Sequence, residues 1–108
     1  MKTALLIVGL LLAMAGLLRA AEAKENWTKH CAKCHGEDGK GQTRMGKQAG
    51  AKDYTDAKIQ AEMKDENAVK VIKEGLTQEG KKKMDAYKEK LSDDEIKALV
   101  AHIRAFKK

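Results

Sequence analysis

The chain has 108 residues, with 22 lysines and arginines against 16 aspartates and glutamates, which gives a net charge of +6. This length allows one small domain at most. One Trp, two Tyr and one Phe are too few for a base-stacking platform, so nucleic acid is a poor candidate partner. Two cysteines also exclude a disulfide framework as the basis of the fold.

The first 23 residues have the organisation of a secretory signal peptide. Lys2 gives the positive start, residues 4–18 form the apolar stretch, and Ala21-Glu22-Ala23 supplies the small-residue cleavage pattern. We therefore expect residues 1–23 to be a signal peptide and residues 24–108 to be an exported, periplasmic domain. Cleavage after Ala20 is the nearest alternative. A bilayer span needs about 20 apolar residues, so an uncleaved membrane anchor is the weaker interpretation.

The exported part of the chain is poor in large apolar side chains. Domains of this size often need a disulfide, a metal or another added element to complete their core. Because a disulfide framework is not available, we expect a buried cofactor to supply the missing apolar mass. The first helix of the domain is expected to begin near Glu25 and to run through Trp27 into the two cysteines, and residues 36–41 follow as a glycine-rich loop.

Two short helices are expected in the middle of the chain. One covers Asp56 to Met63, with Thr55 as its N-cap. The next covers Asp65 to Glu74, where Asp65 is a candidate cap and Gly75 ends the helix.

The last helix has the clearest signals. Ser92 and Glu95 have the spacing of a capping box, and Leu91 and Ile96 flank it as a hydrophobic staple. The apolar residues that follow recur with a helical period, at Ile96, Leu99, Val100, Ile103 and Phe106. No stretch alternates as a strand does, so we predict an all-α domain of three to five short helices.

Residues 31–35 read Cys-Ala-Lys-Cys-His, which is the attachment motif of c-type haem. On a helix, residues three and four apart share one side, so Cys31, Cys34 and His35 would project together. Two thiols placed in this way can form thioethers with the two haem vinyl groups, while the imidazole reaches the iron.

Three other interpretations of the motif are weaker. A thioredoxin-type redox motif needs a βαβ context, which the chain does not offer. A structural zinc site would also draw on His30, but neighbouring residues rarely converge on one tetrahedral ion. A plain disulfide between Cys31 and Cys34 would leave the small core unexplained.

Given this motif, residues 25–108 resemble the class I c-type cytochromes. The small bacterial monohaem carriers are the most similar subgroup. Three segments carry the resemblance. Trp27 stands one turn before Cys31, and the haem motif continues into the glycine-rich loop. Met84 to Tyr87 then resembles the segment with the family's distal methionine, and Leu91 to Ile96 resembles the start of its capped final helix.

The resemblance implies a cytochrome c fold around one covalent haem c, with Met84 as the sixth iron ligand opposite His35. Met63 is a less favoured ligand. A His/Met pair is the ligation that raises the reduction potential of electron-carrying haems. The chain departs from the family where Asp85 replaces the usual proline after the methionine, and where His102 replaces an aromatic that packs near the first helix. Ala23 also stands in place of a usual glycine.

Lys81, Lys82 and Lys83 precede Met84 directly, so we expect them to surround the exposed haem edge. They would form a docking surface for acidic redox partners, although a solvated loop is the alternative interpretation. The predicted function is that of a periplasmic, monomeric, non-enzymatic electron carrier. The alternative is a haem protein with a labile sixth ligand that binds or reacts with NO, CO or peroxide, which the missing proline after Met84 would favour.

Overall fold

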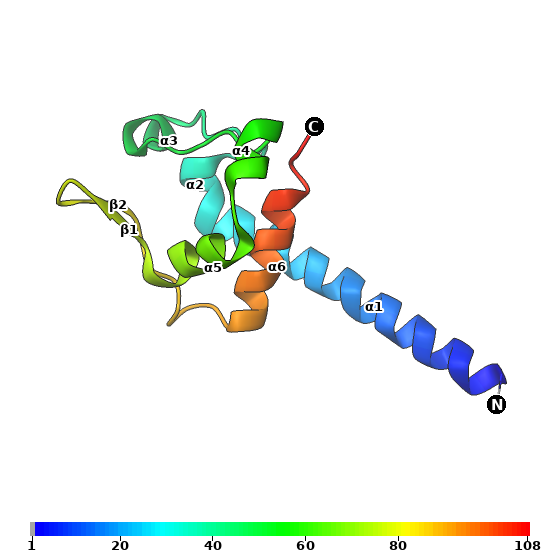
Figure 1. Cartoon of the computed structure of the whole chain (residues 1–108). Coiled ribbons are helices and arrows are strands. Elements are labelled where there is room, and N and C mark those ends of the chain that lie inside the picture. The colour runs from blue at the N-terminus through cyan, green and yellow to red at the C-terminus, as the bar shows by residue number, and fades with distance from the viewer. Residues whose placement is uncertain (1) are drawn as a thin grey trace.

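One long helical stretch opens the structure, which is a computed structural model. It describes the backbone of residues 2–108 and the side chains of Leu11, Met14 and residues 16–108. Helix α1 (Lys2–Asn26) continues without a break into the π-helical turn η1 (Trp27–Cys31) and then into α2 (Ala32–His35). The first helix therefore begins far before Glu25, because leucine and alanine dominate the preceding segment and both favour helix. Its N-terminal part extends away from the rest of the molecule (Figure 1).

Among the described residues, no helix combines the length and the apolar content that a membrane crossing needs.

Three short helices fill the middle of the chain. Helix α3 (Arg44–Ala49) was not predicted; Thr43 caps it by accepting a hydrogen bond from the Gly46 N–H. Helix α4 (Ala57–Glu62) matches its prediction, but its N-cap is Asp56, because the Thr55 hydroxyl instead donates to Asp53. Helix α5 (Asp65–Glu74) begins and ends as predicted; its cap position is Lys64, and Asp65 lies in its first turn.

The prediction that no segment forms a strand is wrong. Strands β1 (Leu76–Gln78) and β2 (Lys81–Met84) pair antiparallel, with a register irregularity between Leu76 and Thr77. A two-residue turn joins them, and both of its residues, Glu79 and Gly80, have positive φ, as in the primed turns that suit hairpins. The strands escape prediction because polar residues occupy both faces. Figure 1 shows this hairpin projecting from the helices.

Helix α6 (Asp93–Arg104) completes the fold and has the predicted capping box, in which Ser92 and Glu95 exchange side-chain and backbone hydrogen bonds. It packs against α1 and α5. The core consists of the buried residues between these helices: Trp27, Cys31, Ile72, Leu91, Ile96, Leu99, Val100 and Ile103. The predicted helical domain is confirmed, and α3 and the hairpin are additions to the prediction.

Candidate functional site

The two cysteines lie on consecutive helical turns beside the core. Cys31 ends η1 and is buried in the core cluster, whereas Cys34 lies on α2 and is partly exposed. They do not form a disulfide with each other. Burial, with a smaller contribution from the nearby Cys34, raises the pKa of Cys31 to about 12. Cys31 is therefore a protonated thiol at neutral pH, unlike the low-pKa cysteines of thiol–disulfide enzymes.

His35 ends the motif and offers a ligand nitrogen. Its Nδ1 atom is buried and has no hydrogen-bond partner among the described residues. Burial lowers the pKa of the imidazole, so the ring is neutral at physiological pH, and a neutral imidazole is the form that binds a metal. Its ring lies 5.5 Å from the Trp27 ring and 5.4 Å from the Tyr54 ring. Two free thiols and a neutral imidazole within one helical segment fit the attachment chemistry of haem c.

The backbone of the motif is fixed by its neighbours. The Trp27 indole N–H donates to the Gly36 carbonyl at 2.9 Å, and the Thr43 hydroxyl donates to the Cys34 carbonyl at 2.8 Å. A side chain at Gly46 would overlap the same Cys34 carbonyl, so α3 approaches the motif closely because it has glycine there. The unpredicted α3 therefore supports the motif from one side.

Met84 lies at the end of β2, away from the motif in sequence. It is half-buried and packs against the core cluster that contains Cys31. Met63 also packs there, whereas Met45 is 43% exposed. The Asp85 carboxylate that follows Met84 is exposed and forms an ion pair with Lys82 at 2.9 Å. Lys82 lowers the pKa of Asp85, so this carboxylate is charged and directed to the surface.

His102 packs where the sequence predicted. Its ring lies 5.4 Å from the Trp27 ring, and the Phe106 ring lies 5.2 Å from Trp27 and 5.0 Å from His102. His30 is half-exposed, and its carbonyl accepts a hydrogen bond from the Tyr87 hydroxyl at 3.1 Å. The first and last helices thus meet around one buried indole.

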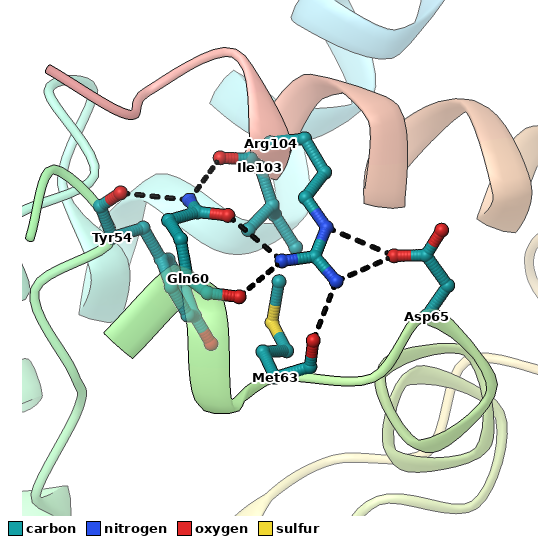
Figure 2. Close-up of polar contacts among 6 residues, drawn as sticks. All are labelled: Tyr54, Gln60, Met63, Asp65, Ile103 and Arg104. Carbon is teal, nitrogen blue, oxygen red and sulfur yellow. Dashed lines mark hydrogen bonds and ion pairs between the residues drawn. The ribbon is translucent and has the colours of Figure 1, made fainter. Parts of the chain in front are cut away.

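Sequence reasoning missed a polar network between α6 and the α4–α5 segment. Buried Gln60 donates to the carbonyls of Tyr54 and Ile103, at 2.7 and 2.8 Å. The Arg104 guanidinium donates to the backbone and side-chain carbonyls of Gln60, to the Met63 carbonyl and to the Asp65 carboxylate. Figure 2 shows these Arg104 contacts converging on its guanidinium. The network joins residues that are far apart in sequence, so no local sequence pattern could have predicted it.

Comparison with known proteins identifies the family. The family model described as "Cytochrome C oxidase, cbb3-type, subunit III" matches residues 18–103. The chain belongs to this family of c-type cytochromes. Comparison with curated proteins gives no match.

Two solved structures are similar to this cytochrome over most of its length. "KustC0563 c-type cytochrome" is 39% identical, with a TM-score of 0.69, and the match covers 80% of this chain and 98% of that one. A tyrosine-to-phenylalanine mutant of Kustc0563 is 38% identical, with a TM-score of 0.70, covering 80% and 99%. The predicted fold class is therefore confirmed as that of cytochrome c.

Membership of the family also establishes the cofactor and the general function. The cytochrome carries covalently attached haem c, and it is an electron-transfer protein. The iron of the bound haem supplies one-electron chemistry. The chain supplies thiols, a neutral imidazole and an apolar boundary of half-buried side chains around its core.

Proposed function

We propose that the cytochrome is a periplasmic carrier of single electrons and not an enzyme. Cys31 and Cys34 form the haem thioethers, and His35 and Met84 are the axial iron ligands. Residues 1–23 act as a cleaved signal peptide, and the mature protein is a monomer. The observation that carries the proposal is the combination of two free thiols with the neutral, half-buried His35 on one helical segment.

The contacts of Met84 support its role as the sixth ligand. It is partly buried against the cluster that includes Cys31, so a sulfur ligand and the attachment motif adjoin the same core. Thioether sulfur opposite imidazole is the ligation that raises haem potential in cytochromes c. Asp85 does not disturb this arrangement, because its carboxylate is paired at the surface.

Replacing the two candidate methionines tests the ligation. An iron–methionine bond gives oxidised haem c a weak far-red absorbance band. We expect the purified holoprotein to show this band, Met84→Ala to lose it, and Met63→Ala to retain it. Reduced wild-type protein should bind CO slowly, whereas Met84→Ala, with an iron position open, should bind it rapidly.

The same measurements address the alternative function. If the wild type lacks the far-red band and its reduced form binds CO readily, the iron has an open position and the carrier proposal fails. The protein would then be a haem protein that binds small ligands. If Met63→Ala alone loses the band, Met63 is the sixth ligand and the assignment to Met84 is wrong.

The lysines before Met84 support docking to acidic redox partners. Lys81 and Lys82 are exposed on β2, and Lys83 is half-exposed beside Met84. Positive charge near the proposed electron-transfer edge would orient acidic partners and increase the rate of encounter.

A further inference from the structure

Contacts from two residues, Gly75 and Tyr87, fix the position of the segment that contains Met84. Gly75, which ends α5, provides one. Its φ of 78° and ψ of −174° lie in a region that is essentially open to glycine alone. A Cβ atom at Gly75 would lie 2.6 Å from the Met84 carbonyl oxygen and 3.0 Å from the Ala86 nitrogen. These are backbone atoms, so they cannot move aside as the end of a flexible side chain would.

Tyr87, three residues after Met84, provides a second contact. Its backbone N–H donates to the Ile72 carbonyl at 2.9 Å, which ties the segment to the end of α5. Its hydroxyl donates to the His30 carbonyl at 3.1 Å. His30 directly precedes Cys31, so this hydrogen bond joins the Met84 segment to the helix that holds the attachment motif.

The hairpin brings Met84 back to the end of α5. Leu76 is the register partner of Met84, so the two strands close at their base immediately after Gly75. The Lys82–Asp85 ion pair is exposed and contributes little to this geometry. Met84 is therefore held by Gly75 at the base of the hairpin and by Tyr87 three residues later.

We propose that Gly75 and Tyr87 are positioning residues that hold the Met84 sulfur toward the haem iron. Gly75 allows the backbone around Met84 to approach the end of α5, and the Tyr87 hydroxyl fixes the segment to the helix of Cys31. The inference rests on the proposed ligation by Met84.

A pair of glycine variants tests it. Gly75→Ala should displace the Met84 backbone, whereas Gly50→Ala is the control, since Gly50 has a similar φ of 77° but nothing within 4 Å of an added Cβ. In holoprotein purified with haem attached, we expect Gly75→Ala to lose most of the far-red band and to bind CO at least about tenfold faster after reduction. A tenfold change corresponds to about 1.4 kcal/mol. Gly50→Ala should retain the wild-type band and CO rate.

A milder variant keeps the proposal testable if Gly75→Ala does not fold. Tyr87→Phe keeps the ring and removes only the hydroxyl, so the chain should fold. We expect its CO association to be about threefold faster than that of the wild type, which corresponds to about 0.7 kcal/mol. Its far-red band should become weaker with rising temperature before the protein unfolds.

The outcomes separate this inference from the ligation on which it rests. If Met84→Ala loses the band while Gly75→Ala and Tyr87→Phe both behave as wild type, Met84 is the ligand but these residues do not position it. Equal losses in Gly75→Ala and Gly50→Ala would point to general backbone strain and would also overturn the inference. A wild type without the band would overturn the ligation and the inference together.

Discussion

Arg104 connects the last helix to several acceptors elsewhere in the fold. Its side chain is 33% exposed, yet it donates to two backbone carbonyls, those of Gln60 and Met63, and pairs with Asp65. A planar guanidinium can serve these acceptors together, which a lysine ammonium on a flexible stem cannot do in the same way. Arg104 thus joins the last helix to the segment between α4 and α5.

We expect Arg104→Ala to lower the free energy of unfolding by about 1–3 kcal/mol, because it leaves partly buried carbonyls without donors. Urea titration of the oxidised holoprotein, followed by haem absorbance, measures the loss. Lys97→Ala on the same helix is the matched control, since Lys97 is exposed, and it should stay within about 0.5 kcal/mol of the wild type. If Arg104→Ala and Lys97→Ala unfold at the same urea midpoint, the Arg104 network is solvated and does not stabilise the fold.

For single residues, the sequence predicts only those features that depend on neighbouring positions in the chain. Cys31, Cys34 and His35 could be placed on one side of a helix, because their spacing alone decides it. Gln60 appears as an ordinary polar residue of a short helix, and nothing near it in sequence indicates that it is 4% exposed beneath the last helix. Gly75 reads as a helix stop, and its contact with the Met84 carbonyl depends on a hairpin that the polar sequence does not reveal.

At the scale of elements, the predictions differ in how closely they match the structure. The start of helix α6 was predicted to the residue because its capping box and apolar period agree, but the helix ends at Arg104, before Phe106. Helix α3 was missed because six residues are too few for a periodic pattern, although Thr43 before it and Gly50 after it are ordinary end signals. The hairpin was missed because its turn, Glu79-Gly80, lies between strands without apolar alternation.

The contact between α1 and α6 includes a residue that the proposed cleavage would remove. Ala23 is 2% exposed, although the sequence pattern places it at the end of the signal peptide. We expect a domain that begins at Lys24 to be less stable than one that begins at Ala21, by about 1 kcal/mol, because a buried methyl and a helical turn are lost. Thermal unfolding of the two purified holoproteins measures the difference.

A third form of the protein separates the loss of the buried methyl group from the loss of the helical turn. The domain that begins at Ala21 and carries Ala23→Gly lacks the methyl group but keeps the backbone of the turn. If it matches the form that begins at Lys24, burial of the Ala23 methyl accounts for the effect. Identical stability of the Ala21 and Lys24 forms would contradict the expectation and show that the first turn does not contribute to the core.

At the scale of the whole molecule, helix α1 and the basic hairpin occupy different parts of the surface. The molecule extends 60 × 31 × 23 Å, with α1 and the basic hairpin projecting from the helical body in different directions (Figure 1). The hairpin presents consecutive lysines next to the proposed axial ligand. An anionic partner would therefore be drawn to one side of the protein rather than to its surface in general.

We expect neutralisation of Lys81, Lys82 and Lys83 to glutamine to slow electron exchange with ferrocyanide, an anionic reagent, by about three- to tenfold at low salt. The effect should disappear at high salt, because the Debye length falls to about 3 Å at 1 M. Stopped-flow rates, compared at equal driving force after the reduction potentials are measured, provide the readout.

The control carries the same change in net charge at other positions. Lys58, Lys97 and Lys107 are exposed and lie outside the hairpin. Their replacement by glutamine should leave the rate within about twofold of the wild type if local charge near the hairpin is decisive. An equal decrease in both triple variants would mean that net charge alone controls the encounter.

The pairing of the first and last helices also bears on how the protein is made. Asn26 donates to Glu95 across 69 residues of sequence, and the buried Trp27 packs against the final turns of the chain. Non-local contacts of this kind cannot form until the end of the chain has been synthesised. Until α6 has been synthesised, the domain lacks the helix against which Trp27 packs. In the proposed export, an incompletely folded chain would suit passage through a narrow secretion channel, and both cysteines would be accessible for haem attachment before the core closes over Cys31.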